Sequence, residues 1–485
     1  MWLTKKQIQP KMKSYNFIRP IDTKEFSDAT SLLKDFENRK TTPLDVVEKS
    51  LRNIADNHEK INAMIQLFAE ESLQEAKKIT EKESTKKRGK LEGIPISLKE
   101  PIGVKGQEVT GGSIRMPAKI AENDALIVQK LKKEGAIIIA RTNTPEFSFG
   151  HETRNPRFGV TNNPYLKNYI PGGSSGGESA LIASGGSVIG IGTDVGGSIR
   201  YPAHCCGLVG FKPSGKAVSK TGIFPFIEKE DFFLNDWLAV GPITHSVRDA
   251  KLVYEVIADK PPTDSSDLSN AELIISTDFD AEIKNETITE VLIKAKQSLL
   301  NDGLKPRNIE IKNIGKIQWN FGKMMIKAMK LGLKDWLKNN KNIGISVFVE
   351  SLRRVIGEKT VSGEIYSVLL ASKFLEPSDK ELDNKKEKEE LYKKIGKQGV
   401  LLLPTSGDIA LKHNQTMQID MSPLVPNIFS PMIFTNVMDL PSITIPAWKY
   451  RDKKTGLPTS VMLCCLPNSE NLLFETASKL EQVLN

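Results

Sequence analysis

Hydrophobic positions divide the first third of the chain into helical and extended segments. Between residues 23 and 80 apolar residues recur at helical spacing. Residues 93–99 form a mostly apolar run that predicts a short buried strand ending in a lysine. Residues 124–133 then predict an amphipathic helix, and residues 136–140 a strand. This order of strand, helix and strand indicates an α/β sheet that contains parallel strands.

Two turns rich in glycine and serine follow, at residues 171–177 and 193–198. Small residues predict a helix at 178–184, and an apolar run predicts a buried strand at 187–192. Another helical stretch begins directly after the second turn. The two turns therefore flank one helix and one strand.

The pattern loosens between about residues 265 and 397 into helices with lysine-rich faces. Residues 381–390 are nearly all charged and most simply form a solvated helix face. Strand-like patterns return at 400–403 and 442–446, and no internal repeat at a fixed period occurs.

Residues 321–337 predict an amphipathic helix with two contrasting faces. The basic face carries Lys323, Lys327, Lys330 and Lys334, and the opposite face carries Phe321, Met325, Met329, Leu333 and Trp336. A helix of this kind is typical of a membrane interface, where it would admit an acyl chain from the side. Packing of the apolar face against the core is the alternative, and the pattern leaves both open.

Composition places the chain among globular proteins, because 39% of its 485 residues are hydrophobic and 26% are charged. The net charge of +9 is spread along the chain, which fits a lysine-rich solvated exterior or attraction to a membrane surface. No nucleic-acid-binding signature accompanies it, so we expect no nucleic-acid partner.

The four cysteines form two adjacent pairs, which suit neither a metal knuckle nor a disulfide framework. We therefore expect a reducing compartment, no metal and no organic cofactor. The first 20 residues contain no apolar signal region, and no apolar run approaches the roughly 18 residues that span a bilayer. The expected location is the cytoplasm, including a peripheral position on intracellular membranes.

The second glycine-rich turn is a candidate site for nucleophilic chemistry. Ser198 follows Val195, Gly196 and Gly197 at a predicted junction of loop and helix, where free backbone N–H groups converge and favour an anion. Such an arrangement outlines an oxyanion hole. Turns of this composition also cradle phosphates, but neither GxxxxGK[ST] nor a complete GxGxxG motif occurs.

A base for this serine is harder to find among the histidines. The chain has five, and none stands in an arrangement that suggests a triad. Lys99, which closes an apolar strand, can serve instead if burial makes its amine neutral. Lowering a lysine pKa from ~10.4 to near 7 costs about 4 kcal/mol. The alternative is an ordinary solvated lysine at a strand end.

The block from residue 172 to residue 213, GGSSGGESALIASGGSVIGIGTDVGGSIRYPAHCCGLVGFKP, resembles the signature of the amidase signature family. GIPISLKE with VKG resembles the lysine segment of that family. The resemblance is strong over roughly residues 28–260 and fainter over 398–480. It implies an α/β fold in which a large twisted mixed β-sheet is covered by helices. It also implies one amidase domain at 28–485, with an N-terminal extension at 1–27 and a variable helical segment at about 265–397.

The resemblance also implies roles for particular residues. Lys99 is the base, Ser174 is a bridging serine preceded by a cis peptide, and Ser198 is the nucleophile. The remaining roles are an oxyanion hole built from the backbone N–H groups of Val195, Gly196, Gly197 and Ser198, and support of the network by Ser175, Asp194 and Arg200.

Within the family, ESALIASGGS and SLKE look most like fatty-acid amide hydrolases. The implied function is hydrolysis of fatty-acid amides or N-acylethanolamine-type lipids, with an acyl lipid as partner, membrane contact through 321–337 and a homodimer as further expectations. Residues 101–103 depart from the usual sequence of the lipid enzymes. Two alternatives stay open: a glutaminase subunit of a tRNA amidotransferase, and a non-catalytic lipid-binding protein on the same scaffold.

Overall fold

The computed structural model describes most of the chain. The described residues are 27–81, 88–115, 118–224, 236–263, 267–338, 347–355, 357–375, 384–420 and 427–485, with the backbone alone described at 329–338, 347–348 and 420. The expected N-terminal extension therefore lies almost entirely outside them, as does part of the charged stretch at 381–390.

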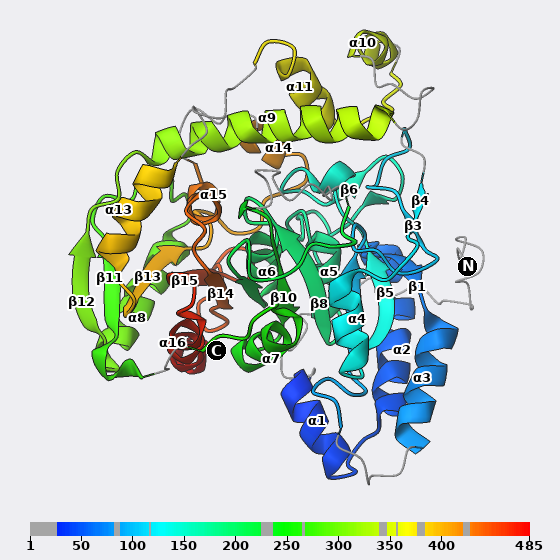
Figure 1. The fold of residues 1–485 in the computed structure, drawn as a ribbon, viewed down its shortest axis with the longest axis horizontal. Helices are drawn as coiled ribbons and strands as arrows, with labels where there is room; N and C mark the ends of the chain where they lie inside the picture. The colour runs from blue at the N-terminus through cyan, green and yellow to red at the C-terminus, as the bar shows by residue number, and fades with distance from the viewer. Residues whose placement is uncertain are drawn as a thin grey trace.

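An eleven-stranded sheet forms the centre of the described structure (Figure 1). Its strands are β1 (Met64–Leu67), β2 (Pro95–Lys99), β5 (Ile137–Thr142), β8 (Ile189–Asp194), β9 (Val209–Lys212), β10 (Ala239–Thr244), β11 (Glu272–Ser276), β12 (Lys305–Ile309), β13 (Gly399–Pro404), β14 (Ser442–Pro446) and β15 (Ser460–Cys464). Their order is β1-β5-β2-β8-β10-β9-β14-β15-β13-β11-β12. Pairing is parallel within β5-β2-β8 and within β13-β11-β12, and antiparallel elsewhere. The expected large mixed sheet is thus confirmed.

Two short strand pairs lie outside this sheet, and helices cover it. The pairs are β3 (Glu108–Val109) with β4 (Lys119–Ile120), and β6 (Arg154–Asn155) with β7 (Gly159–Val160). The helices are α1 (Ala29–Glu37), α2 (Pro43–Ile61), α3 (Ala69–Glu81), α4 (Leu126–Lys133), α5 (Gly176–Ala183), α6 (Arg200–Cys206), α7 (Val247–Ile257), α8 (Glu286–Asn301), α9 (Ile314–Lys338), α10 (Val347–Val355), α11 (Gly363–Ala371), α13 (Lys385–Ile395), α14 (Thr416–Asp420), α15 (Ser430–Val437) and α16 (Glu470–Leu484).

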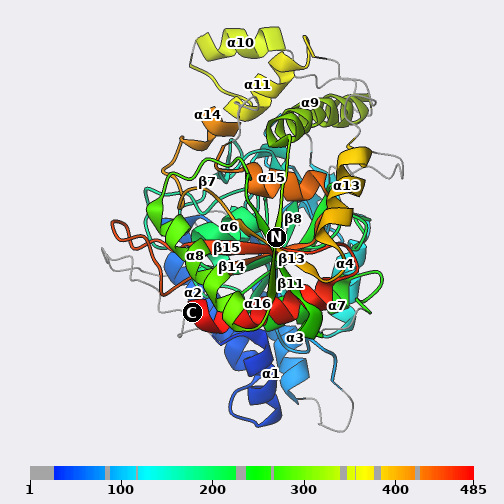
Figure 2. The same ribbon diagram turned by 90° about the vertical axis from the view of Figure 1, so that its left-hand side faces the viewer.

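Helices pack on both faces of the sheet, as Figure 2 shows. Apolar residues of α4, α7, α8 and α16 form one core cluster with the sheet. Residues of α5, α6 and α15 belong to a second cluster on the opposite face. Both views place α9, α10 and α11 together on one side of the molecule, beyond α15. None of the helices that the structure describes has the length and apolar character that crossing a bilayer requires.

The sequence predicted the elements around the two glycine-rich turns well. The strand expected at 93–99 is β2, the helix expected at 124–133 is α4, and the strand expected at 136–140 is β5. The stretch at 23–80 is not all helical, because β1 follows α2 within it. β1 is only four residues long and alternates between buried and half-buried positions, which gives too short a pattern to stand out from the helices around it.

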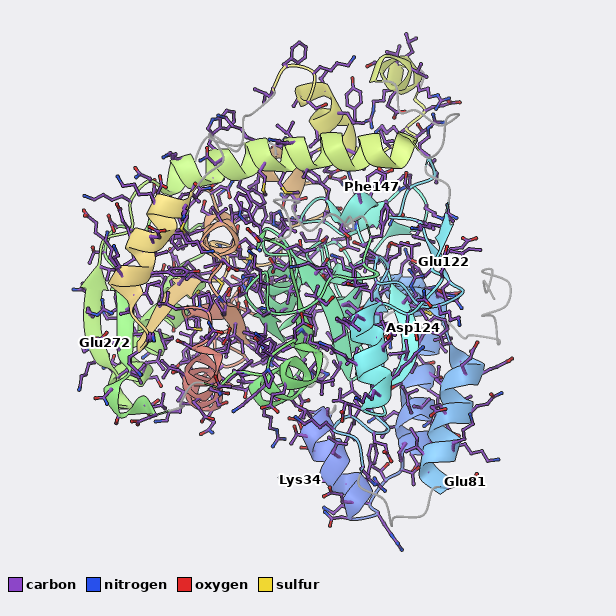
Figure 3. The ribbon with its side chains drawn as sticks, in the orientation of Figure 1. Lys34, Glu81, Glu122, Asp124, Phe147 and Glu272 are labelled. Atoms are coloured by element: carbon purple, nitrogen blue, oxygen red, sulfur yellow. The ribbon has the colours of Figure 1, made fainter. Side chains whose placement is uncertain are left out.

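The segment at about 265–397 also contains two strands that its sequence pattern did not reveal. β11 and β12 pair in parallel at the edge of the sheet. β12 has the sequence KPRNI and exposes most of its residues, so it lacks the apolar run by which a buried strand is recognised. Glu272, at the start of β11, marks this edge in Figure 3.

Candidate active site

Lys99 lies at the carboxyl end of β2, and all five residues of that strand are buried. Its Nζ donates to Ser174 Oγ at 2.6 Å and to Thr193 Oγ1 at 2.9 Å. Burial lowers the pKa of Lys99 to about 7, against the fields of Asp194, Glu178 and Glu100, which raise it. The lysine is therefore a desolvated amine that is largely neutral just above pH 7, and not a solvated strand end.

Ser174 and Ser175 occupy the turn that leads into α5. The Gly173–Ser174 peptide is cis, as the resemblance implied. Ser175 donates its backbone N–H to the carbonyl oxygen of Ser198 at 3.1 Å, so the two glycine-rich turns lie against each other. Ser174 is buried whereas Ser198 is half-buried, which leaves Ser198 as the accessible hydroxyl of the pair. The contact between the two turns is made by the main chain of Ser198. Its side-chain Oγ makes no hydrogen bond to Ser174.

Asp194 and Arg200 form a buried ion pair beneath the Ser198 turn. Arg200 donates to Asp194 from Nε at 3.0 Å and from Nη2 at 2.9 Å. Burial alone would raise the pKa of Asp194, but the Arg200 guanidinium holds it well below its usual range. The carboxylate also accepts the backbone N–H groups of Gly197 at 2.8 Å and Ile199 at 3.0 Å. Asp194 thus fixes the turn that presents Ser198.

The backbone of the turn corrects one part of the expected oxyanion hole. The N–H of Gly197 already donates to Asp194, and the carbonyl of Gly196 lies 3.0 Å from His151 Nε2. The peptide between Gly196 and Gly197 is therefore held on both sides, and its N–H points to the carboxylate. Of the four expected oxyanion-hole donors, the N–H groups of Val195, Gly196 and Ser198 remain.

Three residues that the sequence did not single out belong to this site. Thr193 is the second partner of the Lys99 amine, and Glu178 acts on that amine through its charge. His151 stacks on Phe429, with ring centroids 4.0 Å apart, while it holds Gly196. Thr193 and Glu178 lie within the signature block, but nothing in the sequence shows where their side chains point. His151 is distant in sequence from the turn and carries no signal.

Helix α9 covers the Ser198 turn with apolar side chains. A Cβ on Gly196 would come within 2.7 Å of Phe321 Cζ, so a larger residue there would displace the Phe321 ring. Phe321 stacks on Trp237 at 6.2 Å between ring centroids. The apolar cluster over the turn consists of Val195, Trp237, Phe321, Met324, Met325 and Ala328.

This packing accounts for two of the apolar residues in the segment at 321–337. Phe321 and Met325 pack over the turn, since that contact removes apolar surface from water, and the core-packing alternative holds for them. Both side chains are half-buried, and membrane contact through 321–337 stays a prediction. Met329, Lys330, Leu333, Lys334 and Trp336 lie outside the described side chains. On the same side of the molecule, Phe147 packs with residues of α11 (Figure 3).

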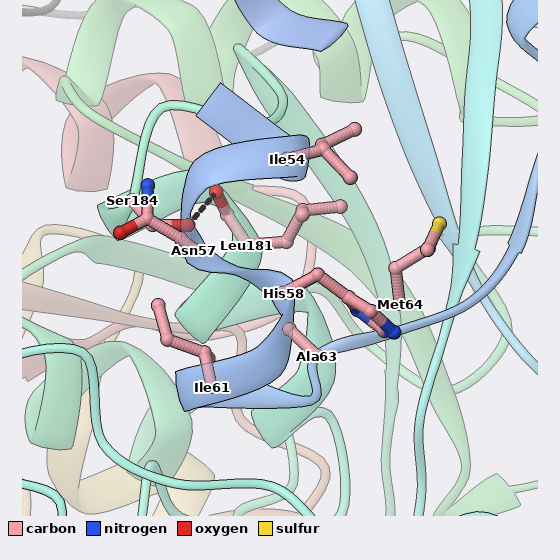
Figure 4. Close-up of a pocket in the computed structure, with 8 residues that line it drawn as sticks. All are labelled: Ile54, Asn57, His58, Ile61, Ala63, Met64, Leu181 and Ser184. Atoms are coloured by element: carbon pink, nitrogen blue, oxygen red, sulfur yellow. Dashed lines mark hydrogen bonds between the residues drawn. The ribbon is translucent and has the colours of Figure 1, made fainter. Parts of the chain in front are cut away.

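A small pocket lies at the other end of α5. Residues from α2, from the start of β1 and from α5 line it, among them Ile54, His58, Met64, Leu181 and Ser184 (Figure 4). Ser184 donates to the Leu181 carbonyl at 3.0 Å. Because Ser174 and Ser175 precede α5 and Ser184 follows it, this pocket is separate from the site around Lys99.

Comparison with known proteins agrees with this geometry. A family model described as "Amidase" matches residues 45–474. The chain belongs to the amidase family. A glutamyl-tRNA(Gln) amidotransferase subunit of Alkaliphilus metalliredigens is 28% identical over 487 residues, which cover 93% of this chain and 95% of that protein. The protein of the same name from Lawsonia intracellularis is 35% identical over 274 residues, which span only 56% of this chain and 54% of that protein.

Solved amidase structures share the fold. A structure titled "Crystal structure of amidase" has a TM-score of 0.78 at 24% identity and covers 95% of this chain and 100% of its own. A structure titled "Fatty acid amide hydrolase" has a TM-score of 0.77 at 20% identity, and the match covers 99% of this chain and 92% of that one. At these identities the likeness establishes the fold alone. The expected likeness to fatty-acid amide hydrolases is therefore shown for the fold, and for the substrate it stays a prediction.

The buried ion pair gives a prediction on stability. Asp194→Asn leaves the Arg200 guanidinium buried without its carboxylate, so we expect a loss of about 3–5 kcal/mol in the free energy of unfolding. Asp124→Asn is the control, because Asp124 pairs with the half-exposed Lys132 at 2.7 Å and such a surface pair contributes about 1 kcal/mol or less. Figure 3 labels Asp124. Urea unfolding measures both, and equal losses would contradict this account.

Proposed function

We propose that this protein is a serine amidase in which Ser198 is the nucleophile and Lys99 the base, with Ser174 between them. The observation that carries the proposal is the 2.6 Å contact from Lys99 Nζ to Ser174 Oγ at a fully buried amine. A neutral amine accepts a proton, whereas a solvated lysine is protonated and cannot. Membership of the amidase family supports the same chemistry.

In the proposed acylation step, Ser198 Oγ attacks the amide carbonyl carbon and its proton passes to Ser174. Ser174 at the same time gives its own proton to Lys99 Nζ. The carbonyl oxygen becomes negative and is stabilised by the N–H groups of Val195, Gly196 and Ser198, which need no reorganisation because the turn is fixed. These electrostatic interactions are strongest where water is excluded, as it is around the buried Lys99.

In the second half of the cycle the protons return. Lys99 passes its proton through Ser174 to the departing amine. The amine leaves as a neutral molecule, and the acyl group stays on Ser198 as an ester. Water, deprotonated along the same path, attacks that ester and releases the acid. The supporting residues keep the geometry: Ser175 holds the Ser198 carbonyl at 3.1 Å, and Asp194 with Arg200 holds the turn.

Two substrate classes have specific support. The relatives named as glutamyl-tRNA(Gln) amidotransferase subunits include one matched over 95% of its length, which favours glutamine as amide donor and partner subunits as the setting. The apolar cluster of α9 and Trp237 over the Ser198 turn favours an amide with an apolar acyl group, such as a fatty-acid amide. The likeness to the amidotransferase subunits weighs more, since the fatty-acid amide hydrolase shares only the fold.

Removal of the base tests the proposal most simply. Lys99→Ala takes away the proton acceptor, so we expect amide turnover to fall by about 10²–10⁴-fold while the fold is kept. Lys212→Met is the matched control, because Lys212 is a second buried lysine whose Nζ donates to the Pro213 carbonyl and not to a serine. Wild-type rates in Lys99→Ala would refute the assignment of the base, and the alternative of a non-catalytic lipid-binding protein predicts no turnover in any variant.

The charge of Lys99 makes the reaction pH-dependent. The base works only when uncharged, and the pKa of Lys99 is about 7. We therefore expect kcat/KM to fall about tenfold for each pH unit below that value and to level off above it. A profile from about pH 5 to about pH 9 measures this limb. A rate that stayed constant down to about pH 5 would contradict a lysine base.

A substrate panel separates the two classes. Glutamine and acyl amides of graded chain length are supplied to the same enzyme, with fluorophosphonate labelling of Ser198 as a count of active sites. On the strength of the relatives we expect release of ammonia from glutamine. Turnover that rises with acyl-chain length, with glutamine untouched, would contradict this and establish the acyl-amide class.

A further inference from the structure

Glu178 is a buried carboxyl group beside Lys99 to which the proposed mechanism gives no part. It lies on α5, and its Oε1 accepts a hydrogen bond from Thr142 Oγ1 at 2.6 Å. Its other oxygen is hydrogen-bonded to the Ser97 hydroxyl. Ser97 precedes Lys99 by two residues on β2, so both side chains point to one face of the sheet. Thr142 is the register partner of Lys99 on β5.

The sheet is shaped to admit this carboxyl group. Gly190 of β8 pairs with Ser97, and a Cβ at Gly190 would lie 2.2 Å from Glu178 Oε2. Only a glycine at this position lets the carboxyl group rest on the strands. Glu178 therefore links the helix that follows Ser174 to β2, the strand that carries Lys99, and to the neighbouring strand β5.

Glu178 is poised to change charge near neutral pH. Burial raises its pKa to about 8, against the hydrogen bonds from Ser97 and Thr142 and the field of Lys99, which lower it. Both charge states find partners. When Glu178 is ionised, Ser97 donates a hydrogen bond to it. When Glu178 is protonated, Ser97 can accept a hydrogen bond from it and donate its own to the Ile189 carbonyl, 3.4 Å away.

The other charged groups around the amine have partners of their own. Asp194 on β8 is paired with Arg200. Glu100, next to Lys99, accepts the N–H of Thr110 at 2.6 Å and lies 3.9 Å from Arg141. Of the three carboxyl groups that act on Lys99, Asp194 and Glu100 each lie within 4.0 Å of a guanidinium, whereas both oxygens of Glu178 are hydrogen-bonded to hydroxyl groups.

We propose that Glu178 is a positioning residue for the amidase reaction, which fixes α5 against the strands beside Lys99 and whose charge controls whether that amine carries a proton. The inference rests on the proposed role of Lys99 as the base. An ionised Glu178 favours protonated Lys99 and so withholds the base, whereas a neutral side chain in its place releases it.

The test is the pH dependence of Ser198 labelling by a fluorophosphonate, which needs no knowledge of the substrate. Glu178→Gln keeps the shape and both hydrogen bonds but removes the charge. Glu178 and Lys99 titrate close together, at about 8 and about 7, so the first proton lost from the pair can come from the carboxyl group, which keeps the amine charged. Glu178→Gln removes this competition, and we expect the acidic limb of its labelling rate to move to lower pH. Thr142→Val keeps the carboxyl group but removes one of its donors, which favours the neutral acid, and we expect a smaller shift in the same direction.

Glu146→Gln is the matched control. Glu146 is also buried and accepts the Ser362 N–H at 2.7 Å, but it does not act on Lys99, so its substitution leaves the limb in place. A residue that only packs would alter melting temperature and not the limb. If Glu178→Gln folds and the acidic limb of its labelling rate does not move, this inference alone is overturned. If Glu178→Gln does not fold, the same result in Thr142→Val overturns it. Wild-type protein that is never labelled overturns the proposed function and this inference with it.

Discussion

The exclusion of water from one lysine amine is the constraint on which the site depends. A lysine at the end of a strand is normally solvated and charged, and in that state it can only donate protons. Here β2 is buried along its whole length, and burial outweighs the fields of three carboxyl groups in lowering the pKa of Lys99 to about 7. The pKa of Lys99 can fall this far because nearby negative charge is neutralised by other partners; the charge of Asp194, for example, is paired with Arg200.

The fold creates this environment by bringing two turns to one edge of three parallel strands. β5, β2 and β8 are neighbours and run in the same direction, so their carboxyl ends meet. Lys99 ends one of these strands, and Asp194 ends another and leads directly into the Ser198 turn. The turn before α5 closes the arrangement through the contact of Ser175 with the Ser198 carbonyl. Helix α9 and Trp237 then cover the turn with apolar surface.

Much of this could be predicted from sequence, because it is encoded in contiguous segments. The run that ends in Lys99 and the two glycine-rich turns are local patterns, and they gave the strands, the helix between them and the catalytic candidates. What failed depends on contacts between distant segments. The bond of Gly197 N–H to Asp194, which removes one expected oxyanion donor, and the contact of His151 with Gly196 have no local signature.

The same limit applies to helix α9 and to Glu178. An amphipathic pattern shows that one face of a helix avoids water, but not whether protein or lipid covers it. For Phe321 and Met325 the cover is the Ser198 turn, which lies more than a hundred residues away in the chain. In the sequence Glu178 is one acidic residue in a small-residue helix, and only the fold shows that Gly190 leaves room for its carboxyl group on the sheet.

The neutrality of Lys99 at the pH where the enzyme works is the central claim, and it can be measured directly on the amine. NMR titration of protein labelled with ¹³Cε-lysine, with Lys99→Ala used to assign the signal, gives the pKa of this one group. We predict a midpoint of about 7, because burial lowers the pKa of this amine to that value. A midpoint near ~10.4, the value of a solvated lysine, would contradict the claim.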